Sequence, residues 1–205
     1  MKTRKMIYLL IALVVIGLAY AGWKLTSRNA YESAAYSVLD ADGDIELREY
    51  PELMLVTTNM GTRVQGDDGS FSRLFQYISG NNKGKQKVAM TTPVFMAPES
   101  DQVSNGHMSF VIPKDVAESN IPAPASEQVQ VTARAAGKFA VIRFAGQIEL
   151  EVCKQQQTKL DSWIKEQGYS VDGDAEVAGY DPPWTPGPLR RNEILIRIKS
   201  VEAKE

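Results

Sequence analysis

The residues that could perform chemistry are few and scattered along the chain. Its 205 residues include a single cysteine, Cys153, and a single histidine, His107. One cysteine excludes an intrachain disulfide and every metal site built from several cysteines, and one histidine excludes a two-histidine cluster. No motif places a serine at a nucleophile elbow or spaces side chains as metal ligands. The sequence therefore shows no recognisable set of nucleophile, base and orienting acid.

Carboxylates are the remaining candidates for acid–base chemistry. Glu46 and Glu49 lie on an expected strand, and a membrane-tethered hydrolase could use either one as a general base. Lone carboxylates on a strand usually face solvent, however. The glycine-bearing stretch 61–69 contains Asp67 and Asp68, whose negative charge is wrong for binding phosphate. We therefore expect a binding protein and no enzyme, with the hydrolase as an alternative of a different class.

The charge balance argues against nucleic acid as a partner. Lys and Arg number 23 against 25 Asp and Glu, and Lys2, Arg4 and Lys5 precede the first apolar run. Without these three, the net charge is about −5, whereas affinity for nucleic acid rests on clustered Lys and Arg. Apolar residues make up 43% of the chain, which is enough for an ordinary core. The length favours one large folded unit.

Residues 1–22 have the order of a targeting or anchoring segment: basic, then apolar, then small. Met6–Leu18 carries no charge over 13 residues, and the run through Ala21 has 16. This is just under the roughly 17 residues that cross a bilayer, so length leaves a signal peptide and a single transmembrane anchor both open.

The residues after this segment support both outcomes. Ala19 and Ala21 fit a cleavage site, while Trp23 and Lys24 fit the interfacial end of an uncleaved helix. We expect a linker over 23–35. Both outcomes place the rest of the chain in a bacterial periplasm, either free or held at the inner membrane.

The body shows the same order of elements twice. Period-two patterns predict strands and period-3.6 patterns predict helices. The first half, about 44–113, has strands at 45–48, 53–60, 88–96 (interrupted at Pro93) and 107–112, with a helix at 71–78 that Asp67, Asp68 or Ser70 caps and Gly80 ends. The second half, about 128–200, has strands at 128–132, 138–144, 175–180 and 193–199, with a helix at 147–167.

This order predicts an α+β fold built from two pseudo-repeated strand-strand-helix-strand-strand units. Each unit has one sheet face that its single helix cannot cover, so the halves bury most surface by packing together. We expect a distorted antiparallel β-barrel with the helices outside, preceded by the N-terminal apolar helix.

Several segments resemble one known family. Lys87–Val94 (KVAMTTPV) is similar to the K-I-x-M-T-x-P-V element of the SOUL heme-binding proteins, and Ala178–Pro183 (AGYDPP) followed by Arg190–Glu193 (RRNE) is similar to their C-terminal element. Ile45–Pro51 and Tyr77–Asn82 fall in the order and spacing of that family. The resemblance covers the body and implies a SOUL-like domain over 36–205, a twofold-repeated barrel, and binding of heme or a related porphyrin.

The resemblance implies a slot between the first helix and the proline-rich loop. Candidate surface residues are Phe71, Phe75, Met90 and Trp184, and candidate partners of the ligand's carboxylates are Arg73, Arg190 and Arg191. Burying ~400 Å² of apolar surface at ~25 cal/mol per Å² gives roughly 10 kcal/mol before association costs, so an iron ligand is not required. In the alternative interpretation the phenylalanines point to the sheet as core, and Arg190, Arg191 and Glu193 form only a solvated strand start.

The sequence departs from the family at the positions that carry basic heme contacts. By rough alignment these positions hold Asp68, Gln76 and Thr185. We therefore keep a second hypothesis, a domain of the same architecture that binds other flat amphipathic molecules and no heme.

No axial iron ligand is assigned. His107 alternates with the apolar positions of its strand, which predicts exposure to solvent, and Cys153 is expected to be a buried small residue. The sulfur candidates are usually core residues: Met60, Met90, Met96 and Met108.

Overall fold

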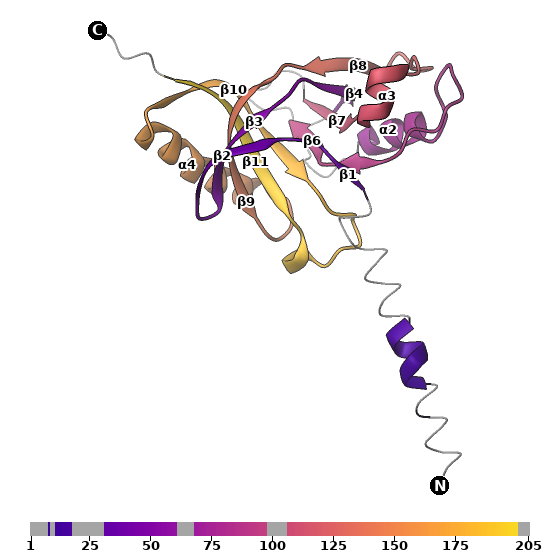
Figure 1. The fold of residues 1–205 in the computed structure, drawn as a ribbon, viewed down its shortest axis with the longest axis horizontal. Helices are drawn as coiled ribbons and strands as arrows, with labels where there is room; N and C mark the ends of the chain where they lie inside the picture. Colours follow the sequence, from indigo (N-terminus) through magenta and orange to yellow (C-terminus); the bar gives the residue numbers. More distant parts are fainter. Residues whose placement is uncertain (1–7, 9–10, 18–30, 61–67, 98–105, 201–205) are drawn as a thin grey trace.

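The computed structural model describes residues 8, 11–17, 31–60, 68–97 and 106–200. Its main feature is one nine-stranded antiparallel sheet with helices packed on it (Figure 1). The sheet contains β2 (Ser37–Asp42), β3 (Ile45–Tyr50), β4 (Leu53–Asn59), β6 (Val94–Ala97), β7 (His107–Val111), β8 (Val129–Arg134), β9 (Gly137–Phe144), β10 (Tyr169–Gly179) and β11 (Asn192–Ser200). The α+β class predicted from the sequence is confirmed.

The strand order of this sheet is β2-β3-β9-β11-β10-β6-β7-β4-β8. Among the described residues no pairing joins β2 to β8, so the predicted barrel is not confirmed. The two-residue strands β1 (Glu32–Ser33) and β5 (Thr91–Thr92) form a separate parallel pair. Two strands, a helix and two strands do follow one another twice along the chain, while a structural repeat of the two halves remains a prediction.

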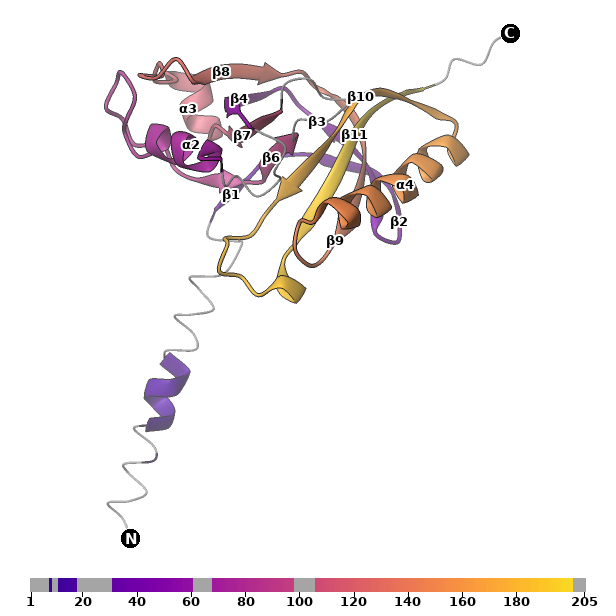
Figure 2. The same ribbon diagram turned by 180° about the vertical axis from the view of Figure 1, so that it is seen from behind.

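Three helices in the described body follow strands of this sheet: α2 (Ser70–Ile78) after β4, α3 (Lys114–Ser119) after β7 and α4 (Leu150–Glu166) after β9. Figures 1 and 2 show α2 and α3 beside β4, β7 and β8, and α4 beside β9, β10 and β11. The main core lies between these helices and the sheet and includes Leu74 and Leu160. A second core on the other sheet face includes Tyr50, Phe139 and Leu195. The alternation along the inner strands therefore buries both faces, whereas the edge strand β2 is exposed throughout.

The N-terminal predictions lie mostly outside the described residues. Residues 11–17 are helical, and no helix in the described ranges has the length and apolarity needed to cross a bilayer. The signal peptide or anchor over 1–22 is otherwise not described, nor are residues 18–30 of the anchor and linker region. β1 and the buried Ala34 fall within the stretch 23–35 that we expected to be a linker.

Some element boundaries differ from the sequence predictions. β10 begins at Tyr169, six residues before the predicted start. The mostly polar run Ser170–Asp174 has no apolar alternation that would predict a strand, and its pairing with β11 decides its conformation. β2 was missed for the same reason, since all its residues are exposed. At the start of α2 the N-cap is Gly69 with φ of 82°, which has no side chain to cap the helix, while the carboxylate of the predicted capping residue Asp68 accepts from the Ser70 amide. Gly80, with φ of 107°, follows the helix end as predicted.

Candidate functional site

An apolar cavity of about 340 Å³ opens between α2, the Met90–Val94 segment and the loop after β10. It is lined by Tyr31, Phe71, Phe75, Met90, Thr92, Val94, Gly179, Tyr180, Asp181, Pro182, Pro183 and Trp184. The structure thus brings together the four residues proposed from the sequence as ligand surface. Contact of these residues with a ligand remains a prediction.

The amphipathic pattern of α2 divides between the core and this cavity. Leu74, Tyr77 and Ile78 are buried against the sheet, as a helical apolar stripe predicts. Phe71 and Phe75 are 36% and 50% exposed. Their assignment to the core is therefore wrong, because α2 directs them along its flank and into the cavity opening.

The proline-rich loop is held in shape by hydrogen bonds to its own backbone carbonyls. Arg190 Nε donates to the Thr185 carbonyl at 2.8 Å, and Arg190 Nη2 donates to the Pro183 carbonyl. The Thr185 amide donates to the Pro182 carbonyl at 3.0 Å. Between these contacts Trp184 is 67% exposed, which confirms that it is not a core residue. The loop therefore forms a stiff wall that presents an aromatic ring at low conformational cost.

A second cavity of about 360 Å³ adjoins the first. The two share Phe71, Val94, Gly179, Asp181 and Pro183. The remaining lining of the second cavity is more polar and comes from Gln147, Asn192 and Arg190, together with Met96, Met108 and Ile148. Phe71 and Gly179 thus stand between an apolar lobe and a mixed lobe, which together suit a ligand with an apolar body and a polar end.

The three arginines proposed as carboxylate partners are placed differently. Arg73 Nε lies 3.0 Å from Thr58 Oγ1, and Arg73 Nη2 lies 2.6 Å from the Asn59 carbonyl, so this side chain ties α2 to the end of β4. Arg190 lines the second cavity while it holds the loop. Arg191 lines neither cavity and joins a buried polar cluster.

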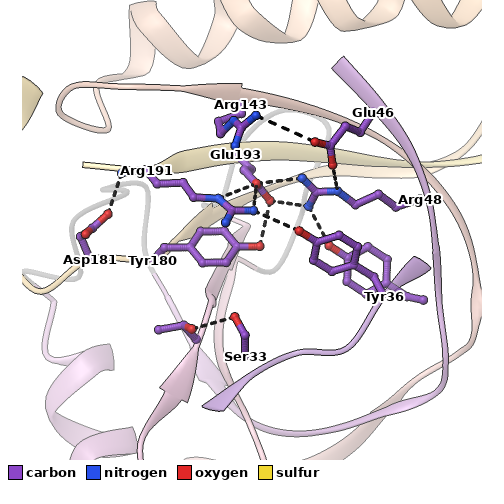
Figure 3. A network of polar contacts seen from close by, with 11 residues as sticks. Ser33, Tyr36, Glu46, Arg48, Arg143, Tyr180, Asp181, Arg191 and Glu193 are labelled. Atoms are coloured by element: carbon purple, nitrogen blue, oxygen red, sulfur yellow. Dashed lines mark hydrogen bonds and ion pairs between the residues drawn. The ribbon is translucent and has the colours of Figure 1, made fainter. Parts of the chain in front are cut away.

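That cluster surrounds Glu193, whose side chain is fully buried (Figure 3). Arg48 binds the carboxylate with two hydrogen bonds, of 2.7 and 2.9 Å. Arg191 Nη2 and the Tyr180 hydroxyl donate to it at 2.6 and 2.8 Å. The prediction of a solvated strand start is therefore wrong for Arg191 and Glu193. The cluster fixes the start of β11, and with it the end of the loop, against β3.

The protonation state of the cluster follows from its contacts. Burial alone would raise the pKa of Glu193, but the hydrogen bonds and charges of Arg48 and Arg191 outweigh burial and lower that pKa. Burial and the neighbouring Glu193 carboxylate raise the pKa of Tyr180. At neutral pH Glu193 is thus an anion saturated with donors and Tyr180 is a neutral donor, which gives this cluster a structural role.

The candidate iron ligands are distributed over the molecule. His107 is half-buried and lines a separate cavity of about 220 Å³ that also contains Arg134 and Glu176. Met90 lines the apolar cavity, while Met96 and Met108 line its neighbour and Met60 is buried. Cys153 is buried in α4, and burial raises the pKa of its thiol to about 11, so the thiol is neutral. Within the described ranges no three His, Cys, Asp or Glu side chains gather as a metal site would require.

Asp68, Gln76 and Thr185 stand at the positions where the family resemblance implies basic heme contacts, and they differ from one another in exposure. Asp68 is exposed, and its carboxylate accepts a bond from the Ser70 amide at 3.0 Å. Gln76 is exposed on α2. Thr185 is buried, and its hydroxyl has no hydrogen-bond partner. A side chain at this last position points into the protein, so a longer basic residue would not fit there without a shift of the loop.

The structure also shows the surroundings of Glu46 and Glu49, the candidate general bases of the hydrolase alternative. Glu46 Oε2 accepts from Arg48 Nε at 2.7 Å, which makes Glu46 an outer member of the buried cluster. Glu49 is exposed and lies beside Tyr36 and Tyr50, on the wall of a different cavity from the apolar one.

The family follows from comparison of the chain with known proteins. Residues 31–197 match the SOUL heme-binding proteins. The chain belongs to the SOUL heme-binding protein family. Heme-binding protein 2 of Homo sapiens is 28% identical over 171 residues, which cover 80% of this chain and 82% of the human protein.

Solved structures similar to this SOUL-family chain come from proteins of other kinds. The C-terminal domain of EcmrR superposes with a TM-score of 0.57 at 14% identity, covering 81% of this chain and 99% of that domain. A hydrolase from Listeria innocua gives 0.52 at 10% identity, covering 78% and 94% of the two chains. At such identities the similarity concerns the fold alone.

Sequence reasoning missed several residues of the cavities in this SOUL-family protein. Tyr31 lies in the expected linker, and Gln147 and Ile148 lie at the expected start of a helix, so no pattern singled them out. The Gly179–Pro183 stretch was recognised as a motif, and its rigidity and its position before Trp184 were the signals that pointed to the wall it forms.

Proposed function

We propose that this protein binds heme or a related tetrapyrrole, without catalysing a reaction, in the apolar cavity between α2 and the Trp184 loop. The observation that carries the proposal is the convergence of Phe71, Phe75 and Trp184 on one opening in a SOUL-family chain. A flat, largely apolar ring gains from aromatic walls, and the cavity falls within the usual range of ligand sites, roughly 300–1,000 Å³. The similar human protein is named for heme binding.

The residues present fit the ring better than they fit the iron. Neither His nor Cys lines the apolar cavity among the described residues, and Met90 supplies a thioether. Bound heme would contribute its iron chemistry, while the aromatic and proline side chains would hold the ring and exclude water. Such a site would serve transport, buffering or sensing of the ligand.

We also propose that the protein is exported from a bacterial cytoplasm, either anchored in the inner membrane through residues 6–22 or released into the periplasm. The order of basic, apolar and small residues at the start of the chain supports this. A mass measurement on the mature protein distinguishes the two forms, because cleavage after Ala21 removes a defined segment.

The second candidate function is the binding of other flat amphipathic molecules. It is favoured by the charge at the apolar cavity, whose described lining contains Asp181 and no Lys or Arg. This lining offers no cation to the carboxylates of a porphyrin, so a neutral or cationic planar molecule would suit it at least as well.

Optical titration with hemin tests the proposal. We expect a saturable, shifted Soret band that Trp184→Ala weakens by roughly fivefold to tenfold in Kd, as expected for loss of a large aromatic contact. His107→Ala should change Kd by less than about twofold, since His107 lines a different cavity. The reverse ranking would refute the site. No Soret change, together with binding of a cationic planar dye that Trp184→Ala weakens, would favour the second candidate.

A further inference from the structure

Large apolar side chains protrude around the opening of the apolar cavity. Trp184 is 67% exposed and Phe75 is 50% exposed, and both line the cavity. Leu189, in the short helix η2 (Gly187–Leu189) of the same loop, is also 64% exposed, but it lines neither of the two adjoining cavities. Exposed apolar groups gathered around one opening mark a surface that meets a partner or a membrane.

The loop that carries Trp184 is stiff. Four prolines lie between Asp181 and Arg190, and Arg190 binds two loop carbonyls. Such a loop loses little conformational freedom when its apolar side chains leave water. An aromatic ring with a polar N–H also prefers the interface between lipid headgroups and hydrocarbon. These properties suit insertion into a bilayer surface.

The apolar cavity also lies at the start of the described body of the chain, which begins at residue 31. Tyr31 lines the cavity, and β1 directly after it pairs with β5, next to Met90. Figures 1 and 2 show β1 near the connection between β10 and β11 in both views. Twelve residues lie between Leu18 and Tyr31, and even a fully extended chain spans only roughly 45 Å from one to the other. A membrane that holds Met6–Leu18 therefore lies within that distance of Tyr31, which lines the same cavity as Trp184.

The charges near the opening indicate the kind of surface. Arg73 and Arg190 are bound to oxygen atoms of the protein, and Arg191 is paired with Glu193. Asp181 lines the cavity. Attraction to anionic headgroups therefore contributes little, and contact would depend on apolar insertion.

We propose that the Trp184 loop rests in the interface of the bilayer that holds the N-terminal segment, so that the apolar cavity opens toward lipid. An apolar ligand could then pass between membrane and cavity without crossing water. This inference rests on the anchored form of the proposed function and does not require that the ligand be heme.

Tryptophan quenching in the full-length chain tests the contact. The chain is reconstituted into phosphatidylcholine vesicles with and without brominated acyl chains, and its mass confirms that residues 1–22 are present. Trp23→Phe removes one of the three tryptophans, and Trp163 is buried. Subtracting the fluorescence of the double variant Trp23→Phe/Trp184→Phe from that of the single variant Trp23→Phe gives the emission of Trp184 alone. We expect brominated lipid to reduce this emission by more than half, equally at low and high salt.

Val171 provides a matched control. It is exposed and lies near the start of β10, eight residues before the end of that strand and roughly 25 Å away along it. In the background that lacks Trp23 and Trp184, Val171→Trp should be quenched by less than about a tenth. Equal emission of Trp184 in both lipids, or failure of the chain to float with vesicles, would overturn the proposal. A blue shift of Trp184 that depends on protein concentration without lipid would assign the surface to a second copy and also overturn it.

The hemin titration in detergent is independent of these outcomes. Hemin binding without Trp184 quenching would leave the proposed ligand in place and remove the membrane contact. Quenching without hemin binding would do the reverse.

Discussion

The rings of Phe71 and Phe75 lie one helical turn apart on α2, with centroids 6.1 Å apart and planes within 13° of parallel. Phe71 is held by an edge contact with Phe110, whose centroid is 5.2 Å away. Phe75 is half exposed, and among the described residues its ring stacks only on that of Phe71. The pair therefore offers a fixed inner ring and an adjustable outer ring at the cavity, an arrangement that suits a flat ligand.

Replacing Phe75 should weaken ligand binding more than it weakens the fold. For Phe75→Ala we expect hemin Kd to rise roughly tenfold, the equivalent of about 1.4 kcal/mol. Thermal unfolding should change little, because the ring is half exposed. Leu150→Ala is the matched control, since Leu150 is 56% exposed and lines neither of the two adjoining cavities. Equal effects of both variants on Kd would contradict this role of Phe75.

Arg190 should act on binding through the loop that it holds. Its guanidinium is engaged by the carbonyls of Thr185 and Pro183, so we expect Arg190→Ala to weaken hemin and its dimethyl ester by the same factor, roughly threefold to tenfold. Trp184 anisotropy should fall as well. If Arg190 instead pairs with the ligand's carboxylates, hemin alone would lose affinity and the ester would not.

The sequence singled out the four candidate surface residues that line the apolar cavity because their signals are local. A tryptophan among prolines has little reason to enter a core, and Trp184 is exposed as expected. Helical spacing placed Phe71 and Phe75 on the same side as Leu74, but it could not tell which of these side chains the sheet would cover. That depends on how α2 sits over β4 and β7, and the sequence pattern does not contain this information.

The arginines and the closed barrel were harder to predict, because both depend on contacts between distant parts of the chain. Arg48 and Glu193 are 145 residues apart in sequence and form a fully buried pair. A period-two pattern gives the face of a strand, and it does not give the strand beside it. Likewise the order of strands predicts two packed halves, while closure depends on whether β2 and β8 meet, and no pairing joins them in the described part of the chain.

Glu193 should be a major contributor to stability. Glu193→Gln leaves Arg48 and Arg191 without their buried counter-charge, for which we expect a loss of about 3–5 kcal/mol in the free energy of unfolding. Glu46→Gln is the matched control. Glu46 also pairs with Arg48, but it is partly exposed, so its loss should cost about 1 kcal/mol or less. Urea unfolding of both variants measures the difference, and similar losses would disprove the assignment.

The effect of Glu193 should depend on pH in a defined direction. The pKa of Glu193 is lower in the folded protein than its ordinary value of 4.5. Its stabilisation is therefore fully present above that value and is lost as pH falls through the lower folded pKa. We expect the stability gap between wild type and Glu193→Gln to be constant from pH 7 to 5 and to shrink below pH 4.5. A gap that widens on acidification would reverse the assigned sign.

Cys153 should behave as an inert core residue and should not ligate iron. Burial raises the pKa of its thiol to about 11, so at pH 8 ionisation alone makes it roughly 200-fold less reactive than a free thiol of pKa near 8.5. We expect negligible labelling by a maleimide in the native state and complete labelling in denaturant. In Cys153→Ala/Ser162→Cys the new thiol lies at an exposed position of the same helix, α4, and should label quickly. The hemin spectrum of Cys153→Ala should match that of wild type. A thiolate-type Soret shift that this variant abolishes would show that α4 opens to admit the ligand, and would move the site away from Trp184.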